Sequence, residues 1–157
     1  MKIVTIGKLK ITRKSNLAKD MPHSDQLGCL GRALIETTST ESRLVRSLLN
    51  KKITSYTAQD TAKGRETDLI SDNVLEALIT SKLASHDCSD PVLFHYTASR
   101  DLNQWTLNRI DNALGHTSPN CVICHLHGNL KRRHTDQPKH ESKTRQLVKQ
   151  KASTEKP

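Results

Sequence analysis

Apolar residues recur at helical spacing in two segments of the chain, residues 40–50 and residues 71–83. In the first segment they are Leu44, Val45, Leu48 and Leu49, and in the second they are Val74, Leu75, Leu78 and Ile79. Small polar residues that can cap a helix stand at both starts: Ser39 or Thr40, and Ser71 or Asp72. The pattern therefore predicts two amphipathic helices, each with one face packed in the core.

Shorter apolar runs predict strands outside these helices. Residues 3–6 and 9–12 can pair as a short hairpin, and residues 91–94 form an apolar run of strand length. The stretches between are polar and contain glycine or proline, which predicts a linker or loop over residues 13–30 and a loop over residues 54–68.

Residues 105–133 combine strand, turn and helix signals in one block. The aromatic and β-branched residues within 105–110 predict a strand, and residues 121–123 predict a second one. Between them, residues 111–115 contain an Asp-Asn pair and a glycine, which favour a turn. Residues 129–133 then predict the start of a basic helix, so the expected order is strand, turn, strand, helix.

In one-letter code this block reads WTLNRIDNALGH, followed by CVICHLHGNLKRR. It resembles the ββα-metal core of HNH-type endonucleases, in the branch that includes phage recombination endonuclease VII. Upstream, residues 48–60 and 69–88 resemble the lead-in of related proteins from large DNA viruses. The resemblance covers roughly residues 45–135.

The resemblance implies an α+β fold: a small ββα-metal (HNH-like) core preceded by two helices, with flexible basic ends. We expect a basic, partly disordered N-terminal segment over residues 1–38 and a helical lead-in plus HNH-like domain over residues 39–138. Residues 139–157 are expected to form a disordered basic tail.

The resemblance also implies a metal-dependent DNA endonuclease and assigns three catalytic positions. Asn108 stands where the family has an acidic metal ligand, Asp111 where it has the general base, and Asn129 where it has the second metal ligand. Magnesium or manganese would be the cofactor. Because two neutral amides bind such an ion weakly, Asp111 would have to turn inward to supply the missing charge.

Two histidines offer alternative general bases, His116 and His134, since imidazole titrates near neutral pH. The leading interpretation is an HNH-type endonuclease, with intact or impaired catalysis. The alternative is a catalytically inactive nucleic-acid-binding protein derived from that family. A third interpretation is a small basic protein that acts through protein contacts.

Cysteine and histidine residues crowd the same region. The four positions at which the family carries zinc-binding cysteines hold Ser85, Cys88, His125 and Gly128. The residues present suit a structural zinc ion at a shifted site. The predicted ligands of this ion are Cys88, Cys124, His125 and His127, and His86 is an optional further ligand. Alternatively the cysteines pack in the interior and the histidines lie on the surface.

Positive charge is concentrated at the two ends of the chain. Of the net charge of +9, residues 1–20 carry +5 and residues 131–157 carry +6, whereas residues 21–130 carry −2. Basic arms around a compact body are typical of proteins that bind phosphate backbones, so DNA is the expected partner. The residues predicted to contact nucleic acid are Arg109, Lys131, Arg132 and Arg133.

Composition narrows the class of protein. Aromatic residues make up only 3% of the 157 residues, so the core must be small, and Trp105, the single tryptophan, is expected to fill part of it. No apolar run approaches the length of about 20 residues that spans a membrane. The four cysteines have no secreted disulfide pattern, which favours an intracellular, reducing compartment, the cytoplasm or nucleus of a host cell if the protein is viral.

Overall fold

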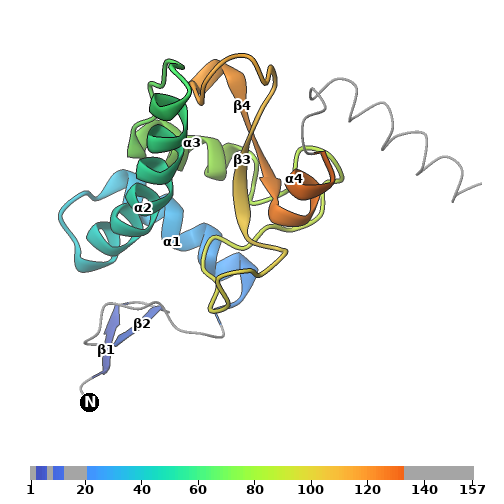
Figure 1. Ribbon diagram of the computed structural model, residues 1–157. Helices are drawn as coiled ribbons and strands as arrows, with labels where there is room; N and C mark the ends of the chain where they lie inside the picture. Colours follow the sequence, from blue (N-terminus) through green and yellow to red (C-terminus); the bar gives the residue numbers. More distant parts are fainter. Residues whose placement is uncertain (1–2, 7–8, 13–20, 133–157) are drawn as a thin grey trace, which may run out of the picture.

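The structure is a computed structural model that describes residues 3–6, 9–12 and 21–132 (Figure 1). Its elements are β1 (Ile3–Ile6), β2 (Leu9–Thr12), α1 (His23–Ile35), α2 (Thr40–Ala62), α3 (Ser71–Thr80), β3 (Trp105–Arg109), the 3-10 helix η1 (Ser118–Asn120), β4 (Cys121–His125) and α4 (Leu126–Arg132). The strands form two separate antiparallel hairpins, β1–β2 and β3–β4. The expected α+β class is confirmed, whereas the predicted C-terminal tail lies outside the described residues.

The N-terminal hairpin predicted from the sequence is confirmed. Ile3 pairs with Thr12, and Ile6 pairs with Leu9, so the two strands align along their full length. The partial disorder expected over residues 1–38 stays a prediction, and residues 1–2, 7–8 and 13–20 of this segment lie outside the described residues.

Residues 23–30 belong to helix α1, so the linker predicted there is wrong. The buried face of α1 consists of Gln26, Cys29, Leu30 and Ala33. Gln26 gives this face a polar residue, although the side chain is buried and makes hydrogen bonds inside the protein. Its Oε1 accepts hydrogen bonds from the backbone N–H groups of Phe94 and His95 at 2.9 and 3.0 Å. In the part of the chain that the structure describes, three helices instead of the expected two therefore precede β3.

Helix α2 begins where the sequence predicted and extends further than predicted. The Ser39 side chain accepts a hydrogen bond from the backbone N–H of Ser42 at 3.1 Å and caps the helix. Instead of ending near residue 50, α2 continues to Ala62 through most of the predicted loop. Ile53, Tyr56 and Asp60 are spaced to continue the buried face, which explains the extra turns.

Helix α3 buries the predicted apolar residues Val74, Leu75 and Leu78, and Ile79 packs partly against the core. Its predicted cap is wrong, because no side chain caps the start. Ser71 and Asp72 are instead bound by Arg46 of α2.

The predicted order of strand, turn, strand and helix is present in β3, β4 and α4. Trp105 pairs with His125, and Arg109 pairs with Cys121. The run at residues 91–94 forms only isolated bridges, between Ala84 and Pro91 and between Leu93 and Gln104, instead of a regular strand.

The β3–β4 hairpin stands between α1–α3 on one side and α4 on the other (Figure 1). One hydrophobic core joins α1, α2 and α3 to the hairpin, and Trp105 lies in it at 1% exposure, stacked on Phe94. Among the described residues, no helix is long and apolar enough to cross a membrane.

Candidate metal and nucleic-acid site

Alternation along β3 gives the hairpin two distinct faces. Trp105 and Leu107 belong to the hydrophobic core, so this face points toward α1–α3. Because neighbouring side chains in a strand point in opposite directions, Thr106 and Asn108 point to the other face. That face is covered by α4, which packs against both strands. We call the two sides the core face and the α4 face.

Asn108 is the most unusual residue on the α4 face. It is 1% exposed, and among the described residues neither Oδ1 nor Nδ2 of its side chain has a hydrogen-bond partner. An unpaired buried polar group costs roughly 1–3 kcal/mol and is rare unless an ion, water or ligand completes it. Asn129, the other predicted metal ligand, lies half-buried on α4. The two amides thus come from elements packed against each other.

Arg109 and Asp111 are bound within the loop that follows β3. The Nη1 of Arg109 donates to the backbone oxygens of Asn112 and Leu114, at 3.0 Å each, and burial lowers the pKa of this guanidinium. Asp111 is exposed, and its Oδ1 accepts a hydrogen bond from the backbone N–H of Ala113 at 2.8 Å. The Asp111 carboxylate therefore stabilises the turn instead of turning inward.

His116 is paired with Asp60, a residue that sequence reasoning missed. The Oδ2 of Asp60 lies 2.8 Å from His116 Nδ1 and accepts the His116 backbone N–H at 2.7 Å. Burial lowers the pKa of His116, and Asp60 opposes the shift. The imidazole packs on Tyr56, whose hydroxyl accepts the backbone N–H of Leu107. The pair therefore ties the end of α2 to the β3–β4 loop.

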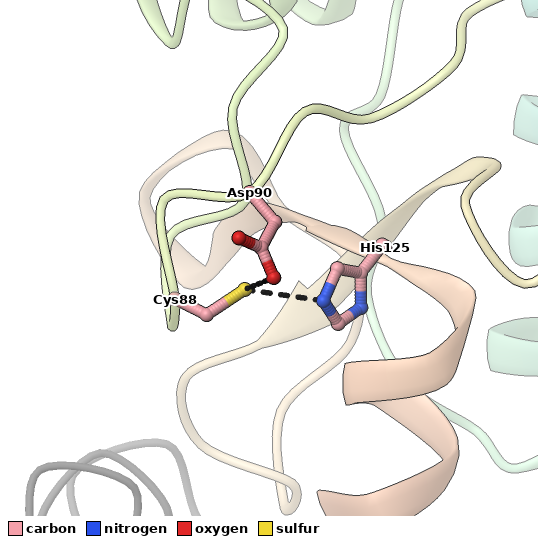
Figure 2. Close-up of side chains that lie close together, drawn as sticks. All are labelled: Cys88, Asp90 and His125. Carbon is pink, nitrogen blue, oxygen red and sulfur yellow. Dashed lines mark hydrogen bonds between the residues drawn. The ribbon is translucent and has the colours of Figure 1, made fainter. Parts of the chain in front are cut away.

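A cluster of three potential metal ligands lies where the loop before β3 meets the end of β4 (Figure 2). Cys88 Sγ is 3.1 Å from Nε2 of His125 and 3.3 Å from Oδ2 of Asp90. The loop is held in place because the His86 backbone N–H donates to the Ile123 oxygen of β4 at 2.8 Å. Asp90 was missed, although it lies only two residues after a predicted ligand.

The protons in this cluster are fixed by the backbone. Nδ1 of His125 accepts the N–H of Gly128 at 2.6 Å, so the single proton of a neutral ring lies on Nε2. That N–H donates to Cys88 Sγ, and the thiol donates to Asp90. Desolvation raises the pKa of Cys88, so it stays a neutral thiol. Gly128 permits the contact, because a Cβ there would lie 2.8 Å from the ring.

A zinc ion requires a thiolate and a deprotonated nitrogen. If Nε2 of His125 were a ligand, the ring proton would move to Nδ1 and oppose the N–H of Gly128. A tetrahedral ion would also separate sulfur and nitrogen ligands by about 3.5 Å, compared with the 3.1 Å between Cys88 and His125. The three residues therefore do not fit a zinc ion in their present arrangement.

The other predicted metal residues lie outside this cluster. Cys124 is fully buried, and desolvation raises its pKa to about 12. His127 is exposed, with its ring 5.7 Å from that of His125 between centroids. Of the four predicted ligands, the structure brings together Cys88 and His125. All four cysteines of the chain are free thiols.

The predicted nucleic-acid contacts separate into exposed and buried residues. Lys131 is exposed on α4. Arg132 is 3% exposed, and its Nη2 donates to the Ile110 oxygen at 3.4 Å and to Asn112 Oδ1 at 3.2 Å. It joins α4 to the turn after β3, which differs from the exposed position that a phosphate contact requires. Arg133 and His134 lie outside the described residues.

We compared the chain with protein-family models, curated proteins and solved structures. No protein-family model matches this chain, and no curated protein or solved structure is significantly similar to it.

Proposed function

We propose that this chain is a nucleic-acid-binding protein built on an HNH-like β3–β4–α4 unit that does not hydrolyse DNA efficiently. One observation carries the proposal: within residues 21–132, the side chains expected to charge the metal site or move a proton bind the protein itself. Arg109 holds the loop, Asp111 stabilises its turn, and His116 is paired with Asp60. A hydrolytic site needs a free base and usually a carboxylate ligand.

Binding is supported by the charge on and after α4. Lys131 is exposed there, and residues 131–157 carry a net charge of +6. Such a segment releases counterions from a phosphate backbone and binds with little regard to base sequence. The partner is therefore expected to be DNA, with an affinity that falls steeply with salt.

A structural zinc ion is not part of this proposal, because Nδ1 of His125 accepts the Gly128 N–H and so leaves the proton of a neutral ring on Nε2, the nitrogen that faces Cys88. The cluster instead links the loop before β3 to the start of α4.

The second candidate is a metal-dependent endonuclease, and the amide of Asn108 favours it. A magnesium or manganese ion could complete this unpaired, buried group, with Asn129 of α4 as a further oxygen ligand. When bound, the ion would polarise a phosphodiester. The weakness of this candidate is the lack of charge in the two predicted ligands.

A plasmid-nicking assay with magnesium or manganese, run beside an EDTA control and the Asn129→Ala variant, separates the candidates. We expect no metal-dependent nicking, together with salt-sensitive binding of labelled DNA in anisotropy titrations. Metal-dependent nicking that Asn129→Ala abolishes would establish the endonuclease and overturn the first proposal. Absence of DNA binding would remove both.

Asn108→Asp tests where the metal position lies. A carboxylate at position 108 should raise the affinity for manganese and any nicking activity, because it restores an anionic ligand. If metal affinity and nicking both stay unchanged, Asn108 is not at a metal position.

A further inference from the structure

Helix α2 exposes no negative charge, although it is 23 residues long. Its two carboxylates are both buried and engaged: Glu41 is paired with Arg32 at 2.8 Å, and Asp60 is paired with His116. Protein surfaces that serve only solubility usually mix charges of both signs. The exposed side of α2 therefore differs from an ordinary solvated helix.

The exposed side of α2 is instead lined with hydrogen-bond donors. A shallow depression of about 730 Å³ along it is lined by Arg43, Arg46, Ser47, Asn50, Lys51 and Thr54. Their spacing of three or four residues places them on one side of the helix. Arginine, lysine, serine, threonine and asparagine are the side chains that most often donate to phosphate oxygens in DNA complexes.

Two cations on this side are available to a ligand. Arg43 and Lys51 are exposed, and within the described part of the chain neither makes an ion pair or a hydrogen bond through its side chain. They are eight residues apart, a helical rise of about 12 Å. Along the axis of B-DNA, which rises about 3.4 Å per base pair, this distance corresponds to three to four base pairs.

Arg46 lies between the two free cations and is held rigidly. Its guanidinium pairs with Asp72 of α3 and donates to the Ala33 oxygen of α1. Arg43 and Lys51 are therefore the cations of the depression whose charge is left for a polyanion.

We infer that the exposed side of α2 is a second DNA-binding surface, which contacts the sugar–phosphate backbone of duplex DNA through Arg43 and Lys51. The inference rests on the proposed DNA binding and adds a contact away from α4, on the opposite side of the β3–β4 hairpin (Figure 1). Because the two available cations would contact phosphates, the surface should bind with little regard to base sequence.

The test is an anisotropy titration of a short fluorescein-labelled duplex with the full chain over a range of salt concentrations. The variant Arg43→Gln with Lys51→Gln removes the two cations. Its matched control, Lys82→Gln with Arg100→Gln, removes two exposed cations outside α2. Lys131→Gln reports on α4 separately. Circular dichroism confirms that each variant is folded.

Loss of two phosphate contacts should weaken binding about tenfold and reduce the slope of log K against log salt by about two. The control pair should change affinity about twofold or less, because distant charges are screened. A duplex of different base sequence should give the same result.

Four outcomes would overturn the inference. If the Arg43/Lys51 variant binds like the native chain while Lys131→Gln weakens binding, α2 makes no contact and the proposed function survives. Equal losses in both double variants would show only a diffuse charge effect. If Arg43 and Lys51 are needed for binding vesicles that contain phosphatidylserine but not for DNA, the surface belongs to a membrane. A native chain that binds no DNA removes the proposed function as well.

Discussion

The two faces of the β3–β4 hairpin differ in whether their buried groups have partners within the protein. On the core face, Leu107 packs among apolar side chains, and its backbone N–H donates to the Tyr56 hydroxyl at 3.1 Å. On the α4 face, Asn108 is equally buried but keeps both amide atoms without a partner among the described residues. The same two strands therefore carry apolar side chains packed in the core on one face and, on the other, a buried amide without a partner among the described residues.

This difference separates stability from binding. Substitutions on the core face should lower the free energy of unfolding, because they remove apolar side chains that are packed in the core. On the α4 face, removing a polar group with no protein partner should cost little or stabilise the fold, unless a bound ligand supplies the partner. The predictions below test that separation from the largest effect to the smallest.

Leu107→Ala should produce the largest loss of stability. Leu107 is 3% exposed on the core face, and truncating a buried leucine typically costs about 2–5 kcal/mol. Urea unfolding followed by circular dichroism measures the change. The matched control is Leu130→Ala on α4, where the side chain is 55% exposed and the expected cost is about 0.5 kcal/mol or less. Equal costs would mean that the core face is wrongly assigned.

Asp60→Asn should lower the free energy of unfolding by about 2 kcal/mol at neutral pH, because the buried carboxylate binds both the ring and the backbone of His116. Urea unfolding again measures the loss. Gln59→Asn, one residue away and exposed, provides the control. A loss no larger than that of the control would show that the pair does not hold the loop.

The same pair predicts how stability depends on pH. Because the folded-state pKa of His116 is lowered, the unfolded chain takes up a proton first as the pH falls. The contribution of the buried, neutral His116 to the free energy of unfolding is therefore fully present above about pH 6.5. It decreases as the pH falls below that value. Asp60→Asn removes the interaction that raises the His116 pKa. In this variant the decrease in stability with falling pH should therefore continue to a lower pH than in the native chain. Parallel curves for the two proteins would contradict this.

Sequence patterns predicted those parts of the fold that depend on local periodicity. The apolar face of α3, the start of α2 at Ser39 and the order of β3, β4 and α4 all follow from spacing alone. Helix α1 was missed because Gln26 supplies part of its buried face, and its partners are backbone groups nearly seventy residues away.

The candidate site was less predictable, because polar residues acquire their roles through distant contacts. Arg132 has the sequence signature of a DNA contact, yet it is buried against the turn after β3. Asp60 and Asp90 have no local signature, and only the fold brings them to His116 and Cys88. Charge in a sequence shows which groups are available, but burial decides which of them can meet a ligand.

Arg132→Ala should destabilise the fold by about 2 kcal/mol, since it removes a buried guanidinium that joins α4 to the Ile110 oxygen and the Asn112 side chain. Lys131→Ala, its exposed neighbour, should change stability by about 0.5 kcal/mol or less and instead weaken DNA binding. Urea unfolding and anisotropy titration on the same two variants measure both effects. If Arg132→Ala weakens DNA binding while stability is unchanged, the arginine contacts DNA after all.

Asn108→Leu should have the smallest effect on stability, and its sign is informative. Leucine has nearly the same shape without polar atoms, so the variant should be more stable than the native chain by about 1 kcal/mol in EDTA. Asn108→Ala controls for lost volume and should be destabilising. Manganese should then raise the stability of the native chain only if the amide binds the ion, and should leave the leucine variant unchanged. If the leucine variant is less stable than the native chain in EDTA, the amide already has a partner, and the α4 face is as complete as the core face.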